Sequence, residues 1–338
     1  VQKFAIDIKE GARNIKNVVA SLSDGDDIST AFQKKIAFST QENIVTANYI
    51  GTSKQAENMD NFEIEVRQLA KPQINLGTFM DKDRLDLRPD TYAFDLETTS
   101  AAYEFQFNVT SSDTNYDVQK KLADLISNAG INLQGSVVED EKGQSALRIE
   151  SGTTGRNRDE EFLFNLTPQG NRNSMTALNV LGIDHISQPS QNAEFLLNGK
   201  ERSSFTNTFS INNAFELTLH GISEEGNPST IGFKANIDAI ADNIQTLVDS
   251  YNGVVQTADK YAKSQQSTRL FRDISSAAFA LQNQLEPLGL MVDSHGEISI
   301  DKALLEEAVN TEDPSESFSV LNNFKNLLNE KATNASLD

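Results

Sequence analysis

Two long amphipathic helix patterns, one near each end of the chain, constrain the fold more than any other feature. In the first pattern, apolar residues follow one another at heptad spacing, three, four or seven positions apart: Phe4, Ile8, Ile15, Val18 and Leu22. In the second, apolar residues step by three and four without a break from Ile237 to Tyr261. Each stripe needs a partner that removes it from water, and the other stripe is the most available partner. The pattern predicts a helical bundle or coiled-coil domain built from both chain ends.

Between these stripes the hydrophobic period changes from three and four to two, which indicates β-strands. Expected strands are 44–50, 62–69, 74–79, 103–109, 135–139, 146–150, 161–166, 193–197, 214–219 and 231–235. Helices are expected after residue 113 and at 174–181. Further along, the pattern predicts a helix at 267–284, a tight hairpin at 291–300 and a helix at 302–309.

The order of these patterns predicts an α+β protein of several nested domains, as expected for 338 residues. The helical domain would comprise 1–37 and 237–338. A discontinuous, mostly β domain would comprise 38–90 and 187–236. A small α+β domain, 91–186, would be inserted into it, with its ends Asp90 and Ser187 close together. Whether the helical stripes pack within one chain or also between subunits stays open at this stage.

Charge and composition exclude several classes of protein. Asp and Glu number 49 against 29 Lys and Arg, so the formal net charge is -20. This balance disfavours binding to nucleic acid or to anionic membrane surfaces, and it suits a protein kept soluble by mutual repulsion. No apolar run approaches the roughly 20 residues that cross a bilayer. The absence of cysteine removes disulfides and thiolate chemistry.

The sequence offers no recognisable catalytic, cofactor-binding or metal site, so we expect no enzyme, no cofactor and no metal. His185, His220 and His295 lack the spacing of metal ligands and are expected in turns or at the surface. Nucleophile-elbow and phosphate-loop motifs are missing. The acidic loop from Asp293 to Asp301 departs from the calcium-binding pattern and fits a hairpin better. The many carboxylates leave a pair of the glycosidase type as an alternative, but the chain has no tryptophan, and sugar-binding surfaces usually need aromatic faces.

Several short motifs follow one another along the chain. The first group is Ile36-Ala-Phe38-Ser and Phe62-Glu-Ile-Glu-Val66-Arg-Gln68-Leu69-Ala70; the second is Ala193-Glu-Phe195-Leu-Leu-Asn198-Gly199, Thr206-Asn207-Thr208, Phe215-Glu-Leu217-Thr218-Leu219 and Tyr251-Asn252. The third runs Leu288-Gly289-Leu290-Met-Val-Asp293, Gly296-Glu-Ile298-Ser-Ile300-Asp301 and Leu304-Leu305. Their types and order resemble the flagellar filament cap family, hook-associated protein 2. The stretch from Val118 to Ile149 resembles the small insert of hook- and flagellin-related proteins.

The resemblance implies a non-enzymatic assembly factor of the bacterial flagellum. Such proteins form a homo-oligomeric ring at the filament tip, where they help exported flagellin to fold and insert. This location lies outside the cell. Export without a cleaved signal and an export chaperone for the full-length protein are also implied. The family's first residues and its long C-terminal helical segment are expected outside this stretch, and Asn213-Ala214-Phe215 departs from the usual lead-in. The alternatives are another axial flagellar protein, such as a hook–filament junction protein, a surface adhesin or a secreted enzyme.

Overall fold

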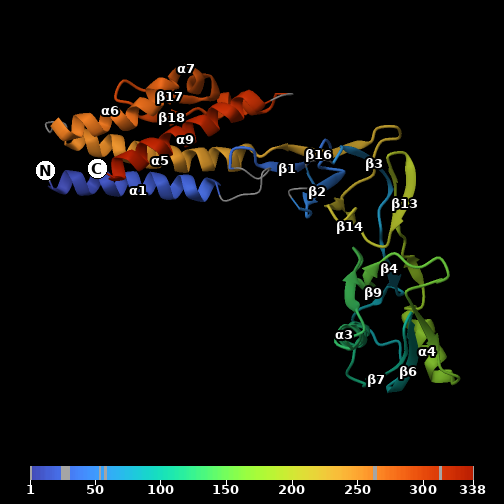
Figure 1. Cartoon of the computed structure of the whole chain (residues 1–338). Coiled ribbons are helices and arrows are strands. Elements are labelled where there is room, and N and C mark those ends of the chain that lie inside the picture. The colour runs from blue at the N-terminus through green and yellow to red at the C-terminus, as the bar shows by residue number, and fades with distance from the viewer. Residues whose placement is uncertain are drawn as a thin grey trace.

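The computed structural model describes residues 2–23, 31–52, 55–56, 59–261, 265–311 and 314–337. Three separate hydrophobic cores divide these residues into a helical rod, a split β unit and an insert (Figure 1). The three follow one another in space, and the insert bends away from the axis of the rod. Both ends of the chain lie at the end of the rod that is remote from the β structure.

The rod contains three long helices, α1 (Gln2–Ser23), α5 (Ile237–Lys260) and α9 (Ser315–Leu337). Helix α1 packs against both α5 and α9, and the stripe residues Phe4, Ile8 and Ile244 lie in one core. The expectation that the two terminal stripes lie side by side is therefore confirmed. Helix α9 was not predicted, and it supplies Leu321, Phe324 and Leu328 to the same core.

Shorter elements cover the rod beside α5 and α9. The predicted helix 267–284 is divided into α6 (Gln265–Ala280) and α7 (Gln282–Leu285), followed by a 3-10 turn η1 (Glu286–Leu288). The predicted hairpin is confirmed as β17 (Leu290–Val292) and β18 (Ile298–Ile300). Helix α8 (Lys302–Val309) follows, and the Asp301 carboxylate caps its first turn by accepting from the Ala303 and Leu304 amides.

The split β unit contains two sheets around one core. The larger has the order β1-β16-β3-β12-β13, and the smaller has the order β14-β15-β2. The strands are β1 (Lys35–Ser39), β2 (Val45–Tyr49), β3 (Phe62–Gln68), β12 (Ala193–Leu197), β13 (Lys200–Ser204), β14 (Thr208–Ile211), β15 (Phe215–Leu219) and β16 (Ser229–Ala235). Strands β1, β13 and β14 were not predicted, because their side chains are mostly exposed or half-buried and give a weak alternation.

The insert packs two helices against two sheets. One sheet is β10-β6-β7 and the other is β11-β4-β9-β5, with β8 also paired to β9. The elements are β4 (Pro72–Leu76), β5 (Met80–Asp81), β6 (Asp90–Thr98), β7 (Ala102–Val109), α3 (Asn115–Ser127), β8 (Leu133–Glu139), β9 (Gln144–Thr154), β10 (Phe164–Pro168), α4 (Arg172–Leu181) and β11 (Ile186–Gln188). A capping box between Thr114 and Asp117 fixes the start of α3.

Residues 72–90 lie with the insert, which differs from the expected boundary at 90 and 187. Strands β4 and β5 both pair with β9, and β11 pairs with β4. Met80 and Leu87 are buried in the core of the insert. The chain crosses between the two units at Lys71 and Gln191, which form an isolated bridge. The two ends of the insert therefore meet at this bridge. The boundary differs from the expected one because pairing with β9 draws β4 and β5 into the sheet of the insert.

None of the helices in the described ranges combines the length and apolar character that a bilayer crossing requires.

Candidate functional site

The three histidines lie far apart in the fold and are all exposed. The His220 imidazole Nε2 is 2.9 Å from the Thr46 hydroxyl. His295 stands in the β17–β18 turn, and His185 lies in the turn after α4. Their expected positions in turns or at the surface are confirmed. Within the described part of the chain, no group of three or more His, Cys, Asp or Glu side chains could hold a metal ion.

The acidic loop after Asp293 is a hairpin turn. One carboxylate oxygen of Asp293 accepts hydrogen bonds from the backbone amides of His295 and Glu297, both at 2.9 Å. Gly296 has a φ of 88°, which the turn requires and which glycine adopts without strain. The carboxylate therefore holds the turn closed.

The Tyr251-Asn252 pair of α5 fastens this hairpin to the rod. The buried Tyr251 hydroxyl donates to the Gly296 carbonyl at 2.5 Å. The Asn252 side chain donates to the Ile298 carbonyl at 2.8 Å and accepts from the Ile298 amide at 2.9 Å. Burial and the nearby charges of Asp293 and Glu297 raise the pKa of Tyr251 well above its ordinary value. The pair thus joins two motifs that lie over 40 residues apart in sequence.

Two asparagines of the split β unit make comparable contacts. Asn198 and Gly199 form the two-residue turn between β12 and β13, both with positive φ. The Asn198 side chain accepts from the Glu63 amide at 2.9 Å. Asn207 accepts from the Ala70 amide at 2.7 Å and donates to the Ala70 carbonyl at 3.0 Å. The side chains of the second motif group therefore hold β3, the strand of the first group, at both ends.

Amide side chains also fix the junction between the split β unit and the insert. Backbone bonds join Lys71 and Gln191 in both directions, at 2.9 and 3.1 Å. The Asn192 side chain accepts from the Arg156 amide at 2.9 Å and donates to the Arg156 carbonyl at 3.1 Å. The Gln68 side chain donates to the Asn192 carbonyl. Because every one of these bonds crosses between strands or units, the junction is held as a defined corner.

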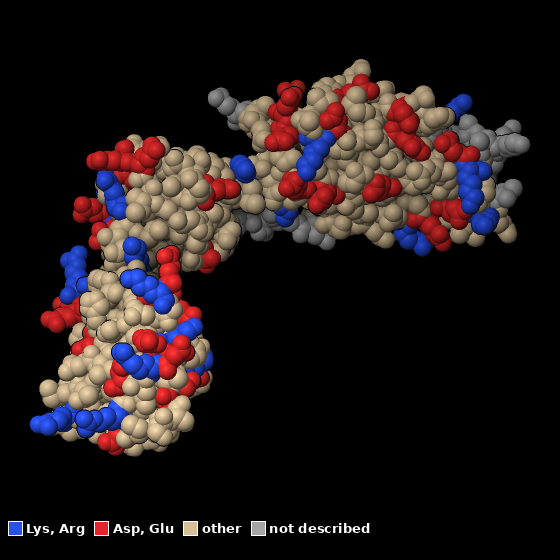
Figure 2. Space-filling view, turned by 180° about the vertical axis from the view of Figure 1, so that it is seen from behind, with Lys and Arg blue, Asp and Glu red and all other residues tan. Residues whose placement is uncertain are grey.

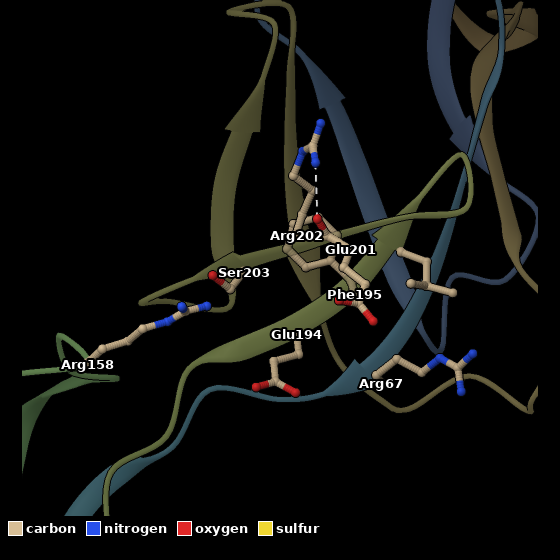
Figure 3. A pocket seen from close by; sticks show the side chains of 8 residues that line it. Arg67, Arg158, Glu194, Phe195, Glu201, Arg202 and Ser203 are labelled. Carbon is tan, nitrogen blue, oxygen red and sulfur yellow. Dashed lines mark hydrogen bonds between the residues drawn. The ribbon is translucent and has the colours of Figure 1, made fainter.

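A hollow of about 570 Å³ lies in this corner (Figure 3). Figure 3 shows Arg158 entering from the insert, while Glu194 and Ser203 come from β12 and β13. Its lining comprises Arg67, Arg158, Glu194, Phe195, Leu196, Glu201, Arg202 and Ser203. The Arg67 guanidinium is paired with Glu65 at 2.8 Å.

This corner offers charge of both signs and neither histidine nor cysteine among its described lining residues. Its guanidinium and carboxylate groups can form ion pairs and hydrogen bonds. The sequence motifs contain Arg67, Glu194 and Phe195, but sequence reasoning assigned no site to them and did not single out Arg158 or Arg202. Arg158 and Arg202 come from different units, and no local pattern signals that tertiary packing brings them together.

Residues 190–279 match the family model described as Flagellar hook-associated protein 2 C-terminus. Among curated proteins, none matches the chain. Solved structures are also similar. The flagellar cap protein FliD D1-D2-D3 domains from Escherichia coli share 16% identity, covering 99% of this chain and 96% of that chain, with a TM-score of 0.49. FliD (HAP2) from Pseudomonas aeruginosa PAO1 shares 16% identity, covering 62% of this chain and 93% of that chain, with a TM-score of 0.43.

The polar contacts described above hold strands, turns and units together, and the family match supports a structural protein rather than an enzyme. The match over residues 190–279 supports the resemblance to the flagellar hook-associated protein 2 family that the motifs predicted. The same match supports the prediction that this chain is a flagellar cap protein.

Proposed function

We propose that this chain is the subunit of a cap at the tip of the bacterial flagellar filament, where it promotes the folding and insertion of flagellin. The match of residues 190–279 to the hook-associated protein 2 family carries this proposal. The structure supports it because the resembling motifs contact one another: Asn207 holds Ala70, and Asn252 holds Ile298. A shared set of mutually dependent contacts is stronger support than isolated short motifs.

We further propose a division into three domains with different tasks. A helical domain of 1–37 and 237–338 and a split β domain of 38–71 and 190–236 would carry assembly. The insert, 72–189, would be outermost. Three separate cores and the single crossing at Lys71 and Gln191 support this division. A unit with its own core and adjacent ends can be inserted without disturbing its host.

The proposed partners are further copies of the chain in a ring, flagellin subunits and, for the full-length protein, an export chaperone. The proposed location is outside the cell at the flagellar tip. The formal charge of -20 supports partners other than nucleic acid or an anionic membrane surface.

Deletion of the full-length gene in its own organism tests the cap function. We expect short or missing filaments and flagellin released as soluble subunits, both reversed when the gene is returned. The matched control is the returned gene with a stop codon early in α1. Filaments of normal length that detach at the hook would indicate a junction protein instead, and unchanged filaments and motility would refute a flagellar role.

A further inference from the structure

Strand β7 forms one edge of the three-stranded sheet β10-β6-β7 in the insert. It is eight residues long, from Ala102 to Val109. Figure 1 places it at the end of the insert that is remote from the split β unit, where another chain can reach it. Every residue of the insert, 72–189, is described, so the surroundings of this edge within the insert are fully defined.

The backbone groups of β7 face β6 and the outside in turn. At the β6–β7 turn the Thr98 amide donates to the Ala101 carbonyl at 2.8 Å, which makes these two residues a hydrogen-bonded pair. In an antiparallel pair every second residue bonds to the partner strand, so the odd-numbered residues of β7 bond to β6. The even-numbered residues therefore point their amides and carbonyls away from the sheet. The Asn108 carbonyl agrees with this direction, because it accepts from the Lys121 side chain of α3 at 3.1 Å.

Three of the even-numbered residues leave their outward backbone groups open. The amides and carbonyls of Ala102, Glu104 and Gln106 bond to no described residue. Their side chains are exposed as well. Natural proteins protect such edges with proline or with a bulge, and β7 contains no proline and pairs with β6 without a register shift. The edge of β7 can therefore accept a further strand.

The other edges of the insert are short or covered. Strands β5 and β11 have two and three residues. At β8, the Ser127 hydroxyl of α3 donates to the Gly135 carbonyl at 3.1 Å and accepts from the Gly135 amide at 2.9 Å. At β10, the Gln73 side chain donates to the Phe164 carbonyl at 2.8 Å. The contrast with these edges indicates that β7 is open because a partner strand pairs with it.

We propose that β7 of one copy pairs antiparallel with β7 of a second copy, which joins two three-stranded sheets into one sheet of six strands. The register that charge favours has Phe105 on the two-fold axis, so that Glu104 lies opposite Gln106 of the second copy. The carboxylate can then accept a hydrogen bond from the side-chain amide. Sliding the strands by two residues would instead place the two Glu104 carboxylates directly opposite each other, and like charges in that position are destabilising.

The face of β7 that points into the insert adds an apolar contribution. Tyr103, Phe105 and Phe107 alternate along this face. The two phenylalanines are each 6% exposed, whereas Tyr103 is 37% exposed. In the proposed register Tyr103 lies opposite Phe107 of the second copy, and aromatic pairs across strands stabilise a sheet. Pairing thus covers an aromatic side chain that the single copy leaves partly in water.

The contact uses the same strand on both copies, so it closes after two copies and does not extend into a fibre. It therefore differs from a ring contact and goes beyond the proposed function: it would join two rings through their inserts. Figure 2 shows acidic and basic side chains interspersed over the visible face of the insert. The formal charge of -20 is therefore not gathered there into one repelling surface.

Introduced cysteines test the register directly, because the chain has no cysteine of its own. Opposite residues of a hydrogen-bonded pair have Cα atoms about 5.5 Å apart, a distance that a disulfide spans. We expect an equimolar mixture of the full-chain variants Glu104→Cys and Gln106→Cys to form a disulfide-linked dimer of the two in oxidised glutathione. The control mixture pairs Glu104→Cys with Gln134→Cys, an exposed position on β8. It should cross-link at least about tenfold more slowly.

A proline at residue 106 should prevent the pairing without unfolding the insert. The Gln106 amide points outward and bonds to no described residue, and proline is tolerated where an edge strand turns its amide to solvent. Sedimentation of Gln106→Pro should show association at least about tenfold weaker than that of the wild type, since the proline removes a donor from each strand. The matched control is Ser203→Pro on β13, another edge strand, which should associate like the wild type. Thermal melting by circular dichroism checks that both variants fold.

Charge at residue 106 gives a second readout that leaves the backbone intact. Gln106→Lys would face Glu104 of the second copy, and Gln106→Glu would set like charges opposite each other. We expect the first variant to associate more tightly and the second more weakly than the wild type, each by about threefold. Gln134→Lys and Gln134→Glu change the net charge by the same amounts away from β7, and each should stay closer to the wild type.

Three results would each overturn the pairing proposal. They are a wild-type chain that stays monomeric at every concentration, a Glu104→Cys and Gln106→Cys mixture that cross-links no faster than the control, and equal effects of charge at residues 106 and 134. None of these results bears on the cap function, which deletion and return of the gene test separately.

Discussion

Asn252 of helix α5 and Ile298 of the β17–β18 hairpin exchange two hydrogen bonds, at 2.8 and 2.9 Å, so that one side-chain amide satisfies both backbone groups of a residue 46 positions away. The hairpin contains only two strands of three residues. A hairpin of this size is marginal alone, so its attachment to α5 determines whether it forms.

Replacing Asn252 by alanine should destabilise the rod. Both polar groups of Ile298 would lose their partner in a half-buried position, at a cost of about 1–3 kcal/mol in the free energy of unfolding. Urea unfolding followed by helical circular dichroism measures this loss. The control is Asn323→Ala on the exposed face of α9, where the higher helix propensity of alanine should change stability by less than about 1 kcal/mol. Equal effects of the two changes would contradict the assigned role of Asn252.

The stability of the rod should fall as the pH rises above about 10, the ordinary pKa of tyrosine. The pKa of Tyr251 is raised by burial, so the folded state holds its proton more tightly than the unfolded state. The stabilisation that protonated Tyr251 contributes is therefore fully present below pH 10 and is lost as the pH approaches the raised pKa of the folded state. Tyr251→Phe should flatten this loss, while Tyr103→Phe, which lies outside the rod, should not. An equally steep decline in Tyr251→Phe would exclude Tyr251 as the cause.

A charge at Ile244 should unfold the rod, whereas the same charge at Ile6 should be tolerated. Ile244 is 1% exposed in the core between the helices, and Ile6 is 56% exposed on α1. Burying an unpaired carboxylate at Ile244→Asp should cost about 4 kcal/mol or more. Ile6→Asp should cost less than about 1 kcal/mol. Thermal melting of both variants by circular dichroism tests the pair, and similar melting temperatures would show that the α1–α5 contact is not the core of the rod.

Gly155 should tolerate no side chain, because it lies against the junction. Its φ is 71°, and an added Cβ would lie 2.6 Å from the Phe205 carbonyl oxygen. Gly143 has a similar φ of 76° with nothing within 4 Å of an added Cβ. Gly143→Ala should therefore cost about 1–2 kcal/mol from backbone strain alone, and Gly155→Ala about 1–3 kcal/mol more from crowding. Faster amide hydrogen exchange at Lys71 and Gln191 should accompany only Gly155→Ala.

The insert should be removable without unfolding the rest of the chain. Residues 72–189 begin and end at the Lys71–Gln191 bridge, so a short Gly/Ser linker can span the gap. We expect the shortened chain to keep the cooperative helical melting of the rod. A linker placed from 91 to 186 instead would leave β4 and β5 without β9 and should aggregate. Folding of the second variant but not the first would restore the boundary at 90 and 187.

The apolar stripes determined much of the rod from sequence alone, because a helix repeats its buried face every three or four residues whatever it packs against. Short-range signals similarly determined the β17–β18 hairpin. Helix α9 escaped prediction. Its core face includes Lys325, 8% exposed with its Nζ 5.9 Å from the Phe32 ring centroid, and burial lowers the pKa of this lysine. A charged residue in the apolar row hides the pattern from a sequence reading.

Only the tertiary structure decided where the insert begins and which polar side chains form sites. Strands β4 and β5 belong to the insert because their partner β9 lies about 70 residues further along the chain. The same holds for the corner hollow, whose lining includes Arg158 of the insert and Arg202 of β13. Hydrophobic periodicity is local and can be read in a window of a dozen residues. Strand pairing and charge proximity depend on contacts between distant segments, which exist only once the chain has folded.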